Sequence, residues 1–192
     1  MSYALDFGTS NTVITRVNPV TQQPEIIKLP GCSQQVNNNP PLIPSLIYVE
    51  NASKTDVLVG QTVRDRGLDL ANDPRFFKQF KRGIGTNIQG FLPELDETNV
   101  TFEKVGEWFL NTVIQELKNE SANDINSLVL TVPVDSFETY RHWLGNVCQG
   151  WNIEQIRLLD EPTAAALGYG TTGEELLFCL LYTSDAADEQ QR

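Results

Sequence analysis

The chain has 192 residues, of which 40% are hydrophobic and 20% are charged. This composition is that of a folded globular protein and excludes a disordered or fibrous chain. Its formal net charge of -11 repels phosphate backbones and anionic lipid surfaces, so we expect no binding to nucleic acid or to membranes. The segment 75–82 is locally basic, but it is short.

The three cysteines indicate reduced thiols. Cys32, Cys148 and Cys179 lie far apart and lack C-x-x-C spacing, which argues against a disulfide framework and against a zinc site. The first six residues carry an acid and no long apolar run, so we expect no signal peptide. Together these features favour a cytoplasmic protein.

The first part of the chain is predicted to form strands. Residues 2–17 are apolar and β-branched, with one break at 8–11, which predicts two strands joined by a tight turn. A third strand is expected at 24–29. The next segment, up to residue 44, is rich in proline, asparagine and glutamine and predicts a loop that leaves the sheet. Short strands are expected at 46–49 and 57–59.

From residue 101 onward, helices and strands alternate. Apolar residues spaced three or four apart predict helices over 101–118 and 137–151. Apolar runs predict strands at 127–133 and 155–159. An acidic cap and a first-turn proline then predict an alanine-rich helix that begins near residue 160. This order of elements predicts an α/β layer architecture.

The turn Gly8-Thr9-Ser10-Asn11 is a candidate phosphate-binding loop. Consecutive backbone amides in a turn that contains glycine donate hydrogen bonds to an anion without side-chain bulk. The hydroxyl groups of Thr9 and Ser10 add further donors. On turn composition alone, however, an ordinary polar hairpin explains the segment better.

Four segments of the chain carry motifs that are informative together, because of their residues and their order along the sequence. They are Asp6-Phe7-Gly8-Thr9-Ser10-Asn11-Thr12, Lys78-Gln79-Phe80-Lys81-Arg82-Gly83-Ile84-Gly85, Leu130-Thr131-Val132-Pro133 and Leu159-Asp160-Glu161-Pro162-Thr163-Ala164-Ala165-Ala166-Leu167-Gly168-Tyr169-Gly170. Together they resemble the motifs of the Hsp70-type chaperones, within the actin, sugar kinase and Hsp70 superfamily. The resemblance implies the first lobe of an actin-like ATPase (ribonuclease H-like) fold, with a mixed sheet, flanking helices and an inserted subdomain.

The resemblance also implies a division of the chain. Residues 1–178 would form the first lobe of an Hsp70-like nucleotide-binding domain, with a core of 1–29 and 101–178 and an inserted subdomain of 30–100. The expected second phosphate loop, Asp-x-Gly-Gly-Gly-Thr, does not occur in the sequence. Residues 179–192 instead resemble a translated sequencing adapter. We therefore expect a non-native tail and a truncated chain that is inactive as written.

The resemblance assigns catalytic roles to Lys81, Glu161 and Thr9. Lys81 would reach the γ-phosphate of ATP and orient the attacking water, and the alternative is a solvated basic loop. Glu161, in the first turn of a helix, would position water or hydrated Mg²⁺, and the alternative is simple helix capping. Asp6 would hold Mg²⁺ through its waters.

Two further sets of residues have implied roles. Gly8, Thr9, Ser10 and Asn11 would bind the phosphates of ATP or ADP. Pro133 and Arg141 would relay the nucleotide state to another domain of the chaperone. The alternative for this pair is a proline that ends a strand and an exposed helix arginine.

The implied function is Mg²⁺-dependent ATP hydrolysis by a chaperone that changes its grip on unfolded or partly folded protein segments, together with co-chaperones. Two departures indicate a divergent member. Asn11 stands where many members have an aromatic residue, and Val134-Asp135-Ser136-Phe137 replaces a small-aromatic-aromatic run. Two alternatives on the same fold are an actin-like filament-forming ATPase and a sugar or acid kinase.

Overall fold

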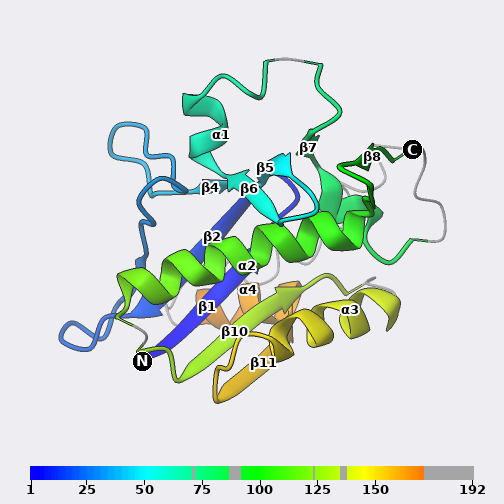
Figure 1. The fold of residues 1–192 in the computed structure, drawn as a ribbon. Coiled ribbons are helices and arrows are strands. Elements are labelled where there is room, and N and C mark those ends of the chain that lie inside the picture. Colours follow the sequence, from blue (N-terminus) through cyan, green and yellow to red (C-terminus); the bar gives the residue numbers. More distant parts are fainter. Residues whose placement is uncertain (71, 87–91, 123, 135–137, 171–192) are drawn as a thin grey trace, which may run out of the picture.

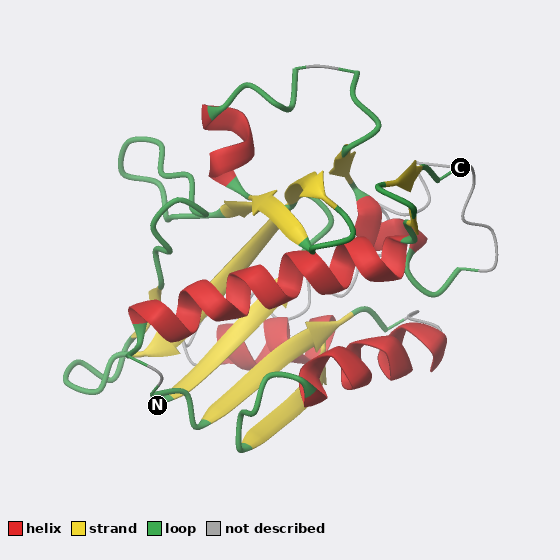
Figure 2. Cartoon of the chain, viewed as in Figure 1, coloured by secondary structure: helices red, strands yellow, loops and turns green. Residues whose placement is uncertain are grey.

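A central mixed sheet has helices on both faces (Figures 1 and 2). Helices α2 (Phe102–Glu120) and α3 (Glu138–Gln149) cover one face, and α4 (Glu161–Gly170) lies on the other. The predicted mixed α/β class with flanking helices is therefore present. The computed structural model describes residues 1–70, 72–86, 92–122, 124–134 and 138–170.

The central sheet has the strand order β11-β10-β1-β2-β3, with β4 paired to β2. Strands β1, β10 and β11 run parallel to one another, and β2 is antiparallel to β1. The carboxyl ends of the three parallel strands therefore meet at one edge. The strands are β1 (Ser2–Phe7), β2 (Asn11–Val17), β3 (Pro24–Ile26), β4 (Ile43–Pro44), β10 (Ser127–Val132) and β11 (Gln155–Asp160).

The core between the sheet and α2 is built around three phenylalanine rings. Phe7 of β1 stacks on Phe109 of α2, with ring centroids 5.8 Å apart. The ring centroid of Phe80 lies 5.5 Å from that of Phe109. All three side chains are buried, and a buried side chain of this size contributes roughly 1.5–3 kcal/mol. Helix α2 begins where the Thr101 hydroxyl accepts a hydrogen bond from the Lys104 amide at 3.2 Å.

A smaller sheet lies in the segment between β4 and α2, with the order β6-β5-β7. Its strands are β5 (Leu46–Asn51), β6 (Asp56–Val59) and β7 (Phe76–Lys78). The segment also holds helix α1 (Gln61–Asp65), the 3₁₀ helix η1 (Phe80–Gly83) and a hairpin of β8 (Glu94–Leu95) and β9 (Thr98–Asn99). The subdomain predicted over 30–100 stays a prediction. Strand β4 falls inside this range, but it pairs with β2 of the central sheet.

Most predicted elements are present. The third strand is shorter than the predicted 24–29, and Trp151 lies just after α3 although it is buried with that helix's apolar stripe. Elements β4, α1, β7, η1, β8 and β9 were not predicted. Among the described helices, none combines the length and apolar character needed to cross a bilayer. The divergent residues 135–137 and the predicted non-native tail, 179–192, lie outside the described residues.

Candidate functional site

The predicted site residues gather at the edge where the parallel strands end. Asp6 is the penultimate residue of β1, Pro133 directly follows β10, and Glu161 follows β11 as the first residue of α4. Strands β1 and β10 are in register at Leu5 and Leu130, so their ends lie side by side. The crevice outside the carboxyl ends of parallel strands is the usual ligand position in open α/β sheets.

The turn after β1 has a geometry that only glycine fits at its first position. A Cβ atom on Gly8 would lie 2.2 Å from the backbone oxygen of Asn11. Ser45 binds two carbonyl groups of this turn. Its hydroxyl donates to the Gly8 oxygen at 2.7 Å, and its amide donates to the Ser10 oxygen at 2.9 Å. In a trans peptide the N–H points opposite to the C=O. The N–H groups of Thr9 and Asn11 therefore point away from Ser45, where an anion can accept from them.

Ser45 is a site residue that sequence reasoning missed. Its side chain is buried, and its hydroxyl also lies 3.1 Å from the buried hydroxyl of Thr12. Ser45 follows β4, a two-residue strand that pairs with β2. Nothing in the local sequence indicated that this serine returns to Gly8, 37 residues earlier.

Asp6 is held by a residue of another predicted motif. Its exposed carboxylate accepts a hydrogen bond of 2.6 Å from the Thr131 hydroxyl of β10. Within the described ranges, no group of three or more His, Cys, Asp or Glu side chains forms a metal cage. A single carboxylate beside a phosphate site suits Mg²⁺, because this ion keeps several waters and uses only one or two carboxylates.

Lys81 and Glu161 form an ion pair across the site. The Lys81 ammonium lies 3.1 Å from a carboxylate oxygen of Glu161, and the two side chains are 8% and 42% exposed. The same ammonium lies 5.5 Å from the centroid of the Phe7 ring, within the range of a cation–π interaction. Phe7 is the last residue of β1 and directly precedes Gly8, so the ammonium lies close to the end of the strand that leads into the turn.

The basic segment 75–82 does not form one charged surface. Arg75 donates to both carboxylate oxygens of Asp96, at 2.7 and 2.9 Å. Lys78 and Arg82 are exposed, as expected for solvated side chains. Of these four cations, Lys81 is the one that pairs with Glu161 in the candidate site.

Arg141 lies at the same edge and binds the carboxylate of Asp160. This ion pair joins α3 to Asp160, the last residue of β11. Asp160 is the acidic residue just before α4 that was predicted to cap this helix, and its carboxylate is bound to Arg141. Pro133 is half-buried at the end of β10. The structure thus places the two predicted relay residues beside the site, and their relay role stays a prediction.

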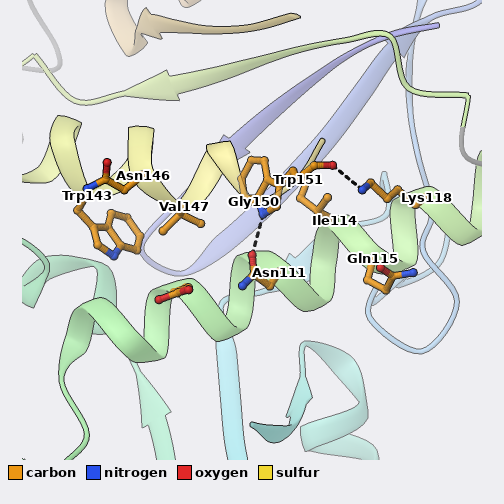
Figure 3. A pocket seen from close by; sticks show the side chains of 10 residues that line it. Asn111, Ile114, Gln115, Lys118, Trp143, Asn146, Val147, Gly150 and Trp151 are labelled. Carbon is orange, nitrogen blue, oxygen red and sulfur yellow. Dashed lines mark hydrogen bonds between the residues drawn. The ribbon is translucent and has the colours of Figure 1, made fainter. Parts of the chain in front are cut away.

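A separate hollow of about 340 Å³ lies between α2 and α3 (Figure 3). Trp143 and Trp151 are among its lining residues, and the Trp151 indole donates to Asn111 of α2 at 2.7 Å. None of the predicted site residues lines this hollow. The candidate phosphate site is therefore distinct from it.

The chain is similar to curated chaperones over most of its length. It is 27% identical over 167 residues to the chaperone protein DnaK of Thermosipho africanus, covering 86% of this chain and 25% of that relative. It is 27% identical over 187 residues to a chaperone protein HscA homolog of Pseudoalteromonas atlantica, covering 88% and 28%. A DnaK of Thermotoga neapolitana is 24% identical over 166 residues, covering 86% and 25%.

No protein-family model matches the chain. The chain spans about a quarter of the length of the curated relatives that it matches. The matched share of this chain, 86–88%, extends well beyond any single motif. The comparison therefore confirms the resemblance predicted from the four motifs: over most of its length, the chain is similar to DnaK and HscA chaperones, which are of the Hsp70 type.

Proposed function

We propose that this chain forms one lobe of a nucleotide-binding domain with the actin-like ATPase fold, in an Hsp70-like chaperone that binds and hydrolyses ATP. The observation that carries the proposal is the convergence of three segments at one edge of the sheet. The turn after β1 offers backbone donors, η1 supplies the Lys81 ammonium, and α4 supplies the Glu161 carboxylate. Backbone amides and an ammonium match the charge of a triphosphate.

Each residue has a defined task in this proposal. The amides and hydroxyls of the turn 8–11 bind phosphate oxygens. Lys81 neutralises charge on the terminal phosphate, and Glu161 accepts a hydrogen bond from the attacking water. Asp6 is kept in place by Thr131 and binds the waters of Mg²⁺, which supplies the charge stabilisation of the phosphates when bound. Thr9 adds its hydroxyl beside the reacting phosphate.

Phosphoryl transfer depends on charged groups that surround the phosphate from more than one direction. The Asp-x-Gly-Gly-Gly-Thr loop, the second phosphate loop of the resembling family, does not occur in the 192 residues. We therefore expect weak nucleotide binding and negligible turnover from this chain alone. In the complete chaperone, the nucleotide cycle would control binding of unfolded protein segments and co-chaperones.

The curated relatives carry chaperone names, so they favour this function over a filament-forming ATPase or a sugar kinase. The test is a calorimetric titration of the purified chain with ATP, with and without Mg²⁺. We expect binding that requires Mg²⁺ and weakens in Asp6→Asn, while the control Asp56→Asn, an exposed carboxyl on β6, binds as the wild type does. Binding that ignores both Mg²⁺ and Asp6 would contradict the proposal.

A further inference from the structure

Tyr140 carries a buried hydroxyl group without a partner. The side chain lies in the first turn of α3, is 4% exposed, and packs against Trp143 with ring centroids 5.5 Å apart. In the part of the chain that the structure describes, no group forms a hydrogen bond with its hydroxyl. Buried polar groups are normally paired, so an unpaired one calls for a functional explanation.

The neighbours of Tyr140 in α3 tie it to both sides of the candidate site. Before it, the Thr139 hydroxyl donates to the backbone oxygen of Gly85 at 3.0 Å, and a Cβ on Gly85 would lie 3.0 Å from the Tyr140 amide nitrogen. Gly85 follows the 3₁₀ helix that carries Lys81. After it, Arg141 binds Asp160, the residue that precedes Glu161. Tyr140 is thus fixed between the two segments that form the Lys81–Glu161 pair.

The charges around the phenol keep it neutral. Burial, and then the negative charges of Glu161 and Asp6, raise the pKa of Tyr140 well above its ordinary value of 10.0. A neutral phenol has one proton to donate. Both carboxylates of the candidate site therefore act electrostatically on this phenol, whose buried hydroxyl has no acceptor among the described residues.

We propose that Tyr140 is a positioning residue of the phosphate site, whose hydroxyl donates a hydrogen bond to the Glu161 carboxylate when phosphate oxygens draw the Lys81 ammonium toward themselves. This inference rests on the proposed function. Glu161 then keeps a partner while its ammonium is shared with phosphate, and Arg141 is already bound to Asp160. A neutral donor holds the carboxylate in place without competing with phosphate for the ammonium.

The test compares Tyr140→Phe with Tyr48→Phe in the full 192-residue chain. The Tyr48 hydroxyl donates to Asp73 at 2.8 Å, away from the site, so this control also loses one phenol hydroxyl. For Tyr140→Phe we expect an Mg·ATP affinity about tenfold weaker than that of the wild type, as for a lost hydrogen bond to a charged group. Its urea midpoint should stay equal or rise, because no bond is lost in the free protein. Tyr48→Phe should show the reverse pattern, with a lower urea midpoint and unchanged affinity.

A second measurement needs no nucleotide. In a Lys81→Met background, Glu161 has lost its ammonium partner, so the Tyr140 hydroxyl should donate a hydrogen bond to the Glu161 carboxylate. Tyr140→Phe should then lower the urea midpoint, because it removes this hydrogen bond. Equal effects of Tyr140→Phe in both backgrounds, or an unchanged Mg·ATP affinity, overturn the proposal. If the wild type fails to bind Mg·ATP, the proposed function fails, and the urea comparison separately decides whether the hydroxyl reaches Glu161.

Discussion

The ammonium of Lys81 lies 3.1 Å from the carboxylate of Glu161, although 80 residues separate them in sequence. The ammonium side chain is almost fully buried, while the carboxylate is 42% exposed. A buried charge without a partner is strongly destabilising, so Lys81 is held at the site by Glu161 and by the face of Phe7. The pair links η1 to α4 at the edge where the parallel strands end.

Replacing Lys81 with methionine should weaken Mg·ATP binding. The methionine keeps much of the aliphatic stem that packs on Phe7 but removes the ammonium. A charge-assisted hydrogen bond contributes about 1.5–3 kcal/mol, so we expect at least about a tenfold loss of affinity by calorimetric titration. Lys78→Met is the matched control, since Lys78 is exposed three residues away. Equal losses in the two variants would mean that bulk charge, and not the position of Lys81, governs binding.

Ser45→Ala should destabilise the protein. The serine hydroxyl is buried and donates to the Gly8 oxygen, and its removal leaves that oxygen and the Thr12 hydroxyl short of a partner. Such a loss costs about 1–3 kcal/mol of unfolding free energy, measurable by urea denaturation. The exposed Ser53, whose hydroxyl donates to Asn51, provides the control variant Ser53→Ala. A Ser45→Ala protein as stable as the wild type would show that the turn does not depend on this clamp.

Two glycine substitutions should have opposite effects. Gly8→Ala places a Cβ 2.2 Å from the backbone oxygen of Asn11, so we expect a loss of about 1–3 kcal/mol, typical of strain at a tight backbone position, together with weaker Mg·ATP binding. Gly145→Ala lies within α3 and would meet no atom within 4 Å. It should stabilise the protein by about 0.5–1 kcal/mol, since alanine favours a helix interior over glycine. Thermal unfolding of both variants checks the signs, and a stabilising Gly8→Ala would contradict the described turn.

Asp96 should make stability depend on pH in acid. Hydrogen bonds from Arg75 and then from the Ala52 amide lower the pKa of Asp96 from 3.8 to about 2. Because the folded-state pKa is the lower one, its contribution is present above pH 3.8 and is lost as the pH falls toward about 2. In Asp96→Asn, the fall of unfolding free energy over this window should be smaller than in the wild type.

The control for this pH dependence is Glu97→Gln, which removes an exposed carboxyl from the same hairpin turn. Urea denaturation at a series of pH values gives the comparison. If Asp96→Asn and Glu97→Gln show the same acid dependence as the wild type, the Arg75–Asp96 pair does not stabilise the folded protein in solution.

Local periodicity in the sequence predicted the elements whose burial follows a regular pattern. Strand β1 alternates, α2 repeats its apolar residues every three or four positions, and the motif that begins α4 is recognisable by itself. The segment between β4 and α2 was less predictable, because its short strands depend on distant partners such as the ion pair of Arg75 with Asp96. Two-residue strands carry too few side chains to show a period.

The candidate site was predictable only in part. Asp6, the turn, Lys81 and Glu161 follow from motif resemblance, and the structure places them at one edge. Ser45 was missed because its contact with Gly8 spans 37 residues. Tyr140 lies within the helix predicted over 137–151, and its side chain is buried. The position of its hydroxyl depends on how α3 docks against Gly85 and Asp160, which the sequence pattern does not contain.

The most direct test of the account is a ¹⁵N-labelled NMR titration of the chain with Mg·ATP. If phosphate oxygens accept from the turn, the amide signals of Thr9 and Asn11 should shift the most, together with the side-chain ammonium of Lys81. Lys81→Met should greatly reduce these shifts at the same nucleotide concentration. Shifts confined to the hollow lined by Trp143 and Trp151, with the turn amides unchanged, would contradict the account.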